Sequence, residues 1–420
     1  MWRAGEWAII EQMERISPSL TLTERGLMCP RGGFGIDPIR PVPIAVITHA
    51  HSDHARWGSG RYLCVRECLE ILRQRLGPSS RIDAFDWREP VRLGDATISF
   101  HPAAHVRGSA QVRIESADEV AVVTGDYKRN ADPTTEPFEV VPCDTFVTES
   151  TFAMPIYRWK ETRETIKELA RWWRNNIERR YASILFCYSL GKTQRVLAEL
   201  DALAREPGWE WINEAMTRQP VLLHGAAGPL VDVYREEGVR MVPTRLMRDE
   251  AVPRRGRVRD DDTMMLEGAS RASPFAGALA IAPPSAAGST WMRRFGEHFD
   301  TAFASGWMRV RGLRRRRGYD NGFVLSDHAD WLDLVRTVEE TGAKRVRITH
   351  GYSEVLARYL RARGVDACSM AHAFRGEYGE AGGDEDAAAA AFTESTDALA
   401  SSSQSPAPTT ESGSDCGEDA

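Results

Sequence analysis

The chain carries Thr48-His49-Ala50-His51-Ser52-Asp53-His54 directly after an apolar run at residues 44–47. Three imidazoles and a carboxylate at the end of a predicted buried strand are typical of a metal site. In an extended segment, residues two apart point the same way, so His49 and His51 can bind one ion. Asp53 and His54 fall at the following turn and face a neighbouring point. The spacing predicts a two-metal site whose nitrogen and oxygen ligands suit zinc, with manganese or iron as alternatives. A His-rich surface loop is the competing interpretation.

Further imidazoles and carboxylates stand at the ends of later predicted strands. His105 lies in a turn of small residues, the setting for a third imidazole on the first metal. Asp126 follows an apolar strand and Gly125, where its two oxygens can bridge two cations. Glu149 and His350 each follow another such strand. Strand ends that repeatedly deliver a metal-binding or catalytic group describe one wall of an active site.

Two other segments each allow two interpretations. Asp37 precedes Pro38 at a strand end, and it either supports the metal ligands or is a turn residue. The basic run at residues 309–317 precedes a strand that ends in Asp327 and His328. This run is either a solvated face or a contact to a phosphate backbone. The candidate phosphate contacts within it are Arg314, Arg315, Arg316 and Arg317.

Lys192 is a further candidate substrate contact, and it lies in a sequence that resembles part of an ATP-binding loop. Gly191-Lys192-Thr193 matches the end of that motif, but residue 186 is Phe where the motif requires Gly. Nucleotide binding is therefore rejected.

Length and composition point to a two-domain cytoplasmic protein. The chain has 420 residues, of which 42% are hydrophobic, so it can bury a large core. No apolar stretch is long enough to span a membrane, and the first residues lack the apolar core of a signal peptide. The seven cysteines are scattered without CxxC pairs, which indicates neither a disulfide framework nor a zinc ribbon. We read Cys64 and Cys68 as packing residues on one helix.

The net charge of −6 conceals two differently charged parts. Residues 376–420 contain eleven acidic residues and no basic ones, whereas residues 1–375 contain 49 acidic and 54 basic residues. The body of the chain is therefore mildly basic, and only five of its cations are lysine. The arginine excess is consistent with phosphate recognition or with the base composition of the genome. The acidic segment cannot bury a core, so we expect a disordered tail.

Alternating helices and strands from about residue 155 predict a separate domain with a parallel sheet. They are a helix at 161–179, a strand at 183–188, a helix at 192–204 and a strand at 221–223. Before this region, residues 20–28 are expected to form one strand and residues 65–76 one helix. We predict domain segments at 1–154, 155–305 and 306–375, followed by the tail at 376–420.

The whole pattern over about residues 15–375 resembles the β-CASP nuclease branch of the metallo-β-lactamase-fold hydrolases. Within that branch, the chain is most similar to the bacterial ligase-associated DNA exonucleases. The strings that carry this likeness are IDPIRPVPIAVITHAHSDHAR, GSAQVRIE, GDYKRNADPTTEPFE, ESTF, YSLGKTQR and SDHADW. The resemblance implies an α/β fold: an αββα sandwich with an inserted, Rossmann-like β-CASP domain.

The resemblance also implies roles for individual residues. It places His49, His51 and His105 on one metal, Asp53, His54 and His350 on the other, and Asp126 between the two. The metals would be two zinc ions, with manganese as the alternative. Asp53, His328 and Glu149 would be catalytic, with His328 protonating the leaving oxygen and Glu149 holding His328 in position. Ala104 departs from the family, which usually has Gly there, and should be tolerated unless that backbone needs positive φ.

The expected activity is metal-dependent hydrolysis of single-stranded or end-frayed DNA, in repair with a DNA ligase and a helicase. An RNA-processing β-CASP ribonuclease is the main alternative, because a histidine such as His350 at the last motif is common in RNA enzymes. A small-molecule esterase or lactamase needs neither the long insertion nor His328. An inactive scaffold subunit would have lost metal ligands, and every ligand position is filled here.

Overall fold

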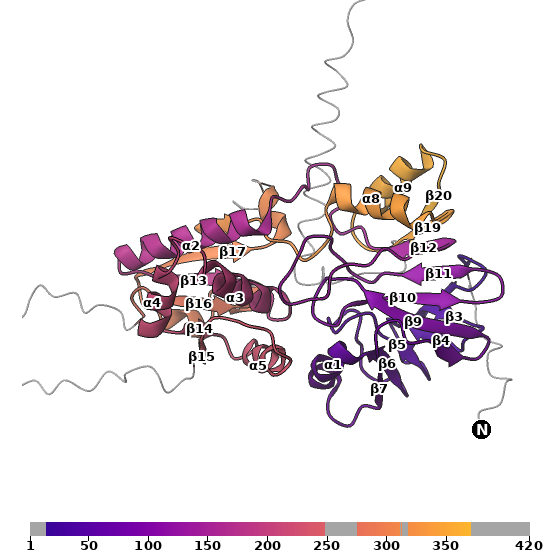
Figure 1. Ribbon diagram of the computed structural model, residues 1–420, viewed down its shortest axis with the longest axis horizontal. Coiled ribbons are helices and arrows are strands. Elements are labelled where there is room, and N and C mark those ends of the chain that lie inside the picture. Colours follow the sequence, from indigo (N-terminus) through magenta and orange to yellow (C-terminus); the bar gives the residue numbers. More distant parts are fainter. Residues whose placement is uncertain (1–13, 248–274, 311, 313–317, 371–420) are drawn as a thin grey trace, which may run out of the picture. The chain divides into compact units, whose positions relative to one another are not determined.

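A computed structural model of the chain describes residues 14–247, 275–310, 312 and 318–370. It contains two seven-stranded mixed sheets and one six-stranded parallel sheet (Figure 1). The predicted acidic tail lies outside the described residues. Among the residues that are described, no helix is long and apolar enough to cross a membrane.

The first sheet is antiparallel at its start and parallel from its fourth strand onward. Its strands, in sheet order, are β1 (Glu14–Arg15), β2 (Thr21–Thr23), β3 (Gly26–Cys29), β4 (Phe34–Ile36), β5 (Ala45–Val46), β6 (Tyr62–Val65) and β7 (Ile82–Phe85). The single strand expected at residues 20–28 is wrong. It is a hairpin instead, because Gly26 adopts φ 95° and reverses the chain.

The second sheet brings together strands from both ends of the chain. Its strands, in sheet order, are β20 (Asp366–Ser369), β19 (Arg345–Ile348), β12 (Thr145–Thr148), β11 (Val120–Val123), β10 (Ala110–Glu115), β9 (Ala96–Pro102) and β8 (Val91–Leu93). β12 and β19 are parallel neighbours, with Thr145 opposite Arg345. The sheet is therefore completed only by residues that follow the third sheet in sequence.

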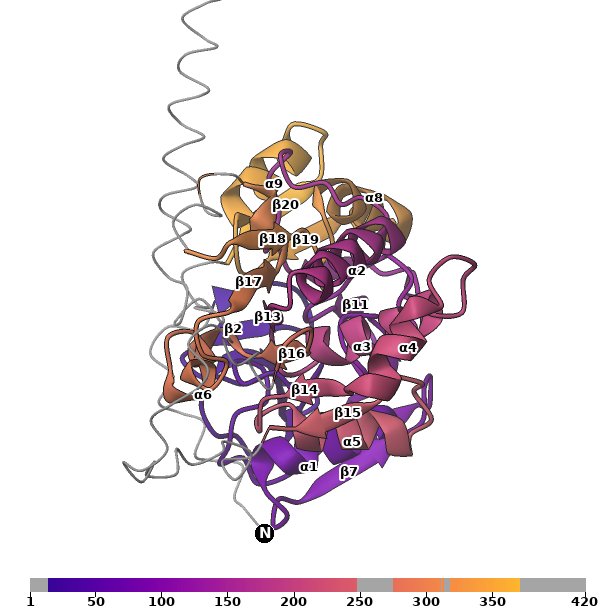
Figure 2. The ribbon, with the colours of Figure 1, turned by 90° about the vertical axis from the view of Figure 1, so that its left-hand side faces the viewer.

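The third sheet is parallel throughout and alternates with helices, as the sequence pattern predicts. Its strands, in sheet order, are β15 (Thr244–Leu246), β14 (Val221–Leu223), β16 (Leu279–Ala282), β13 (Ala182–Phe186), β17 (Phe299–Ala304) and β18 (Asn321–Phe323). The accompanying helices are α2 (Thr162–Glu178), α3 (Lys192–Leu203), α4 (Trp211–Arg218), α5 (Gly228–Glu236) and α6 (Thr290–Arg293). α2 and α3 pack side by side (Figure 2). Because β18 pairs with β17, this sheet continues past residue 305, where we expected the inserted domain to end.

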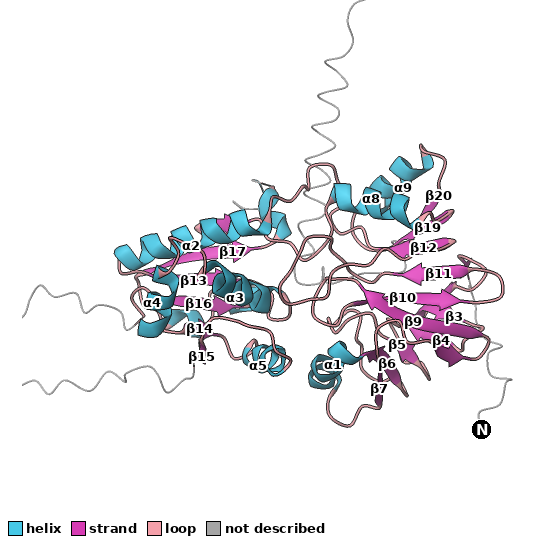
Figure 3. Cartoon of the chain, viewed as in Figure 1, coloured by secondary structure: helices cyan, strands magenta, loops and turns pink. Residues whose placement is uncertain are grey.

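Helices flank the two mixed sheets, whose inner faces share one apolar core (Figure 3). The helix α1 (Leu69–Leu76) packs beside the first sheet, and a 3-10 turn at Arg66–Cys68 precedes it, so the helix expected from residue 65 starts later. The helix α8 (Trp331–Thr341) precedes β19 in sequence, and α9 (Ser353–Arg361) connects β19 to β20. α9 packs on both of these strands. The predicted class is confirmed: a metallo-β-lactamase-type sandwich with an inserted Rossmann-like domain.

Most of the polar motifs follow the carboxyl ends of strands in the first two sheets, whereas Asp327 and His328 follow β18 of the third sheet. The loop after β5 carries residues 48–54, and single groups follow β9, β11, β12 and β19. The backbone at Gly125 approaches the side chain of Thr48 closely, which brings two of these loops together. Gly125 has φ 56°, and a Cβ at this position would lie 2.3 Å from Oγ1 of Thr48. Only glycine therefore allows the loop after β11 to reach the loop after β5.

Candidate metal centre

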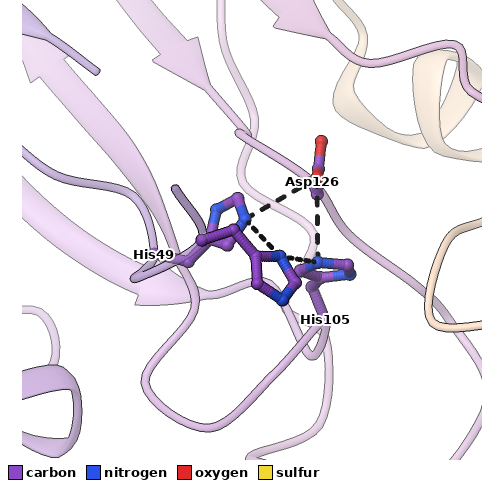
Figure 4. Close-up of side chains that lie close together, drawn as sticks. His49, His105 and Asp126 are labelled. Carbon is purple, nitrogen blue, oxygen red and sulfur yellow. Dashed lines mark hydrogen bonds and ion pairs between the residues drawn. The ribbon is translucent and has the colours of Figure 1, made fainter. Parts of the chain in front are cut away.

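Asp126 lies at the centre of the predicted site. Its Oδ2 atom is 3.6 Å from Nε2 of His49 and 3.7 Å from Nε2 of His105. The same oxygen is 3.6 Å from Nε2 of His54. Figure 4 shows His49, His105 and Asp126 pointing toward one another. One buried carboxylate therefore faces imidazoles that come from two segments of the chain, the loop after β5 and the loop after β9.

Three ring nitrogens converge next to this carboxylate. Nδ1 of His51 is 3.1 Å from Nε2 of His49 and 3.1 Å from Nε2 of His105. His49, His51, His105 and Asp126 are all buried, and each has a ligand atom within 4.8 Å of those of the others. The other ring nitrogen of His51 lies 3.5 Å from the carbonyl oxygen of Leu190, at the entrance to α3. Nitrogen atoms in this arrangement are suited to binding one cation.

The outward nitrogens of His49 and His54 each have a polar partner. Nδ1 of His49 is 3.1 Å from Oγ1 of Thr48, and Nδ1 of His54 is 2.7 Å from Oδ2 of Asp37. Asp37 is itself held by Thr48, which donates its backbone N–H at 2.8 Å and its hydroxyl at 2.5 Å. Such partners fix the ring orientation and leave Nε2 directed inward. Asp37 thus stands where the sequence suggested a supporting carboxylate.

His105 and His350 have the same arrangement. Nδ1 of His105 donates to the carbonyl oxygen of Asp327 at 2.7 Å, and Nδ1 of His350 lies 3.0 Å from Oγ1 of Thr349. Both rings therefore present Nε2 to the interior of the site. The two ligand groups contain five imidazoles. Four of them direct Nε2 into the site, whereas His51 directs Nδ1.

A second group of potential ligands comprises Asp53, His54 and His350. Nε2 of His54 is 3.4 Å from Oδ2 of Asp53. This nitrogen is buried and has no hydrogen-bond partner within the part of the chain that the structure describes, which fits an atom that binds a cation. The three residues line a pocket together with Arg56 and Gly125. The cluster thus contains two adjacent ligand groups, with Asp126 facing both.

His328 and Glu149 form a separate pair beside the cluster. Nδ1 of His328 lies 2.9 Å and 3.0 Å from the two carboxylate oxygens of Glu149. Glu149 also accepts the backbone N–H of Tyr127 at 2.8 Å, and Trp159 donates its indole N–H to the carbonyl of His328 at 2.9 Å. The Nδ1 atom is 4.0 Å from Oδ2 of Asp126. His328 is therefore held on both sides at the edge of the cluster.

Burial and neighbouring charges shift the pKa values in the site. Burial, with help from surrounding imidazoles, lowers the pKa of His49 and of His105 well below the usual range. Burial likewise lowers the pKa of His350 to about 4 and raises the pKa of Asp126 to about 7. Burial also acts to lower the pKa of His54, but nearby carboxylates, Asp53 foremost, raise it well above normal. His49, His105 and His350 are therefore neutral near pH 7, as metal binding requires.

Three residues with unusual backbone angles surround the cluster. Asp37 has φ 42°, Ala104 has φ 62° and His350 has φ 50°. Left-handed angles of this kind cost about 1–3 kcal/mol each in residues other than glycine, and they gather at functional sites. Ala104 therefore has the positive φ at which the glycine usual in the family would be less strained than alanine. The backbone before His105 is therefore strained in this chain.

Of the predicted substrate contacts, only Lys192 lies among the described residues. Lys192 is only 3% exposed, and its amino group lies 2.5 Å from Oδ2 of Asp327. This position favours an internal ion pair over direct contact with a nucleic-acid backbone. Arg314, Arg315, Arg316 and Arg317 lie outside the described residues.

Sequence reasoning missed several residues that support the site. Thr48 and Thr349 each hold an imidazole, and each stands immediately before the histidine that it contacts. Asp327 supports His105 through its backbone carbonyl, which no side-chain pattern reveals. A usable signal existed for Lys128, one of only five lysines, because it directly follows the strand end that carries Asp126.

Comparison with known proteins was made for the whole chain, and no family model matches it. A stretch of 347 residues, 82% of this chain, is 29% identical to a probable DNA ligase of Opitutus terrae and covers 30% of that protein. A stretch of 123 residues, 29% of the chain, is 28% identical to the endoribonuclease YSH1 of Kluyveromyces lactis and covers 16% of it. A stretch of 206 residues is 24% identical to the transcription termination factor FttA of Methanosarcina mazei, over 40% of this chain and 32% of that protein. The chain spans about a third or less of the length of these relatives.

The sandwich, the insertion and the buried His/Asp cluster have the architecture of the metallo-β-lactamase type, with donor atoms that could hold a metal ion. The fold and the buried His/Asp cluster are of the metallo-β-lactamase/β-CASP type, and the sequence is similar to parts of these nucleic-acid-processing proteins.

Proposed function

We propose that this chain is a metal-dependent DNA exonuclease that hydrolyses phosphodiester bonds during repair, in concert with a DNA ligase. The observation that carries the proposal is the convergence of two ligand groups on Asp126, with the His328–Glu149 pair beside them. Phosphodiester hydrolysis at paired metals needs these parts: cation ligands, a carboxylate between the cations and a proton donor for the leaving oxygen.

The chain's own donor atoms divide into two proposed metal sites. The first would be formed by His49, His51 and His105, and the second by Asp53, His54 and His350, with Asp126 shared. The imidazole and carboxylate set suits zinc, with manganese as the alternative. When bound, two such cations would supply a nucleophilic water at neutral pH and charge to stabilise the phosphoryl oxygens.

His328 is the proposed general acid. Glu149 accepts from Nδ1 of His328, so Nε2 is the nitrogen left for the leaving oxygen, and it carries the proton needed there when the ring is the doubly protonated imidazolium. Burial tends to raise the pKa of Glu149, but His328 overcomes this and keeps the pKa below normal, so the carboxylate stays charged. A fixed carboxylate favours the protonated imidazole, which is the form that can act as an acid.

Contacts from the inserted domain support cleavage at strand ends. The carbonyl of Leu190 lies 3.5 Å from the ring of His51, so the start of α3 covers one side of the proposed first metal site. We therefore propose that substrate enters as a single strand or a frayed end, and that Asp53, Glu149 and His328 act on the terminal linkage.

The choice of DNA rests on the similarity to the probable DNA ligase of Opitutus terrae, which extends over 82% of this chain. A nuclease-like segment and a ligase within one polypeptide would act on the same broken DNA, and a helicase would supply frayed ends. RNA is the second candidate, because the other relatives include an endoribonuclease and a transcription termination factor. His350 at the last motif points the same way.

The decisive experiment is a time course on 5′-labelled and 3′-labelled single strands of DNA and RNA with one sequence, in zinc or manganese. The Asp126→Ala variant is the matched control, because it removes the carboxylate shared by both sites. DNA shortened from one end, with RNA intact, supports the exonuclease and gives its polarity. RNA cleavage with DNA intact would establish the ribonuclease instead.

A further inference from the structure

Five charged side chains form a buried cluster where α3 meets the loops after β11 and β18. They are Lys128, Asp132, Lys192, Arg195 and Asp327, and at most 6% of each side chain is exposed. Two of them, Lys192 and Arg195, belong to the inserted domain. We refer to these five residues as the ion cluster. None of them is among the proposed metal ligands.

Each carboxylate of the ion cluster contacts two cations. Asp327 lies 2.5 Å from the amino group of Lys192 and 3.0 Å from the guanidinium of Arg195. Asp132 lies 2.5 Å from Lys128 and 3.4 Å from Nε of Arg195. Although burial acts to raise the pKa of Asp327, these cations, Lys192 foremost, hold it well below the usual range. With three cations and two anions, the cluster keeps one positive charge inside the protein.

The ion cluster contacts His105 at two points. Nδ1 of His105 donates to the backbone carbonyl of Asp327 at 2.7 Å, and Lys128 donates to the backbone carbonyl of His105 at 3.1 Å. Arg195 donates to the carbonyl of Ser326 at 2.6 Å and to the carboxylate of Asp327. Arg195 therefore fixes the peptide whose next carbonyl receives the His105 proton. Both the ring and the backbone of His105 are held from this side.

Stability alone does not explain such a cluster. Taking charges out of water costs several kcal/mol per ion, and well-packed apolar residues of similar size often give equal or greater stability. A hydrogen bond to the outer nitrogen of a metal-binding histidine, in contrast, sets its tautomer and orientation. Without the Asp327 carbonyl, the ring of His105 is free to rotate or to carry its proton on Nε2, the nitrogen that faces Asp126.

We propose that the ion cluster positions His105 for metal binding, so that the first metal site depends on α3 of the inserted domain. Arg195 and Lys192 are the positioning residues, and they act through Asp327. This inference rests on the proposed metal-binding role of His105. It assigns to the insertion a task at the metal site in addition to covering the substrate.

The test measures binding of Co²⁺ alone to the metal-free full chain, in a His350→Ala background that removes one ligand of the second site. We expect Arg195→Lys to raise the dissociation constant of the remaining site about 10- to 100-fold. Lysine keeps the charge but cannot reach Ser326 and Asp327 together. We also expect the visible absorption of bound Co²⁺ to change, because one nitrogen ligand is displaced.

Two further variants make the result interpretable. Lys192→Met removes one contact to Asp327 and leaves two cations opposite two anions, so it decides the matter if Arg195→Lys fails to fold; about tenfold weaker binding is expected. Arg205→Met is the matched control, because Arg205 lies just after α3, is half exposed and pairs only with Asp201 among the contacts described for it. A merely structural role would lower the melting temperature and leave the affinity of the folded protein unchanged.

The outcomes separate this inference from the proposed function. If the chain without cluster substitutions binds no Co²⁺, the metal-dependent function itself fails. If that chain binds Co²⁺ and the folded cluster variants bind it within about threefold of the Arg205→Met control, the positioning role is refuted. Weaker binding and an altered spectrum in the cluster variants, with the control unchanged, would establish it.

Discussion

Replacing Asp37 by Asn tests whether an outer carboxylate sets the metal-binding nitrogen of His54. The carboxylate receives three hydrogen bonds: the backbone N–H of Thr48 at 2.8 Å, the Thr48 hydroxyl at 2.5 Å and Nδ1 of His54 at 2.7 Å. Asparagine has the same shape and tolerates the φ of 42° at this position. Asp37→Asn therefore changes the charge and one acceptor while leaving the backbone as it is.

The size of the effect follows from the direction of the amide group. Its NH₂ would face Nδ1 of His54, since the reverse orientation would set it against the N–H of Thr48. Two donors cannot pair, so His54 would move its proton to Nε2, the atom that faces Asp53 and Asp126. Loss of such a partner costs about 10- to 100-fold in metal affinity, or about 1.4–2.7 kcal/mol of binding free energy.

Calorimetric titration of the metal-free chain with zinc or Co²⁺ measures this difference directly. The control is Asp118→Asn, the same substitution at an exposed carboxylate that pairs with Arg31. Both variants should fold, with Asp37→Asn less stable by about 1–2 kcal/mol through its weakened hydrogen bonds. Unchanged metal affinity in folded Asp37→Asn would refute the assignment of Asp37 as the residue that orients His54.

Three other substitutions or conditions give clear expectations. Asp126→Ala should abolish cleavage and release metal, and full activity would contradict its place between the cations. His328→Ala should retain bound metal but slow turnover by about 10²- to 10⁴-fold, so a near-normal single-turnover rate would exclude the general acid. Metal binding near pH 7 should release at least one proton, because the pKa of Asp126 is about 7 and that of His54 is raised. Affinity should therefore fall as the pH drops from about 8 to about 6, which calorimetry in buffers of different ionisation enthalpy would detect.

The parts of the fold set by local pattern could be predicted from the sequence. β14 has the bounds that the sequence pattern predicts, and the alternation of α2, β13 and α3 indicated the parallel sheet. Pairing between distant strands could not be predicted, because no local sequence pattern specifies that β12 pairs with β19. The short strands β8 and β20 carry too few apolar residues to stand out. The hairpin at Gly26 was missed because apolar and polar residues alternate over residues 20–28 enough to suggest one strand.

The site shows the same division between side-chain patterns and backbone contacts. The histidines and carboxylates were recognisable because few other functions need them at successive strand ends. The residues that support the histidines could not be recognised, because Asp327 and Leu190 contact the imidazoles through backbone carbonyls, which any residue has. The sequence showed that Ala104 stands where the family usually has glycine, but only the structure shows that its backbone is left-handed, with φ 62°. The ion cluster escaped notice because its partners lie far apart in the chain.

The pairing of β12 with β19 has a consequence for synthesis of the chain. Arg345 lies 200 residues after its sheet partner Thr145, so at about 5–20 residues per second the ribosome needs about 10–40 s to make the interval. During that time β12 has an open edge, which is a hazard for association with other nascent chains. Neither His328 nor His350 can join the earlier ligands until nearly the whole described chain has emerged. A polypeptide that has not yet reached β19 therefore cannot assemble the full set of groups of the proposed metal centre.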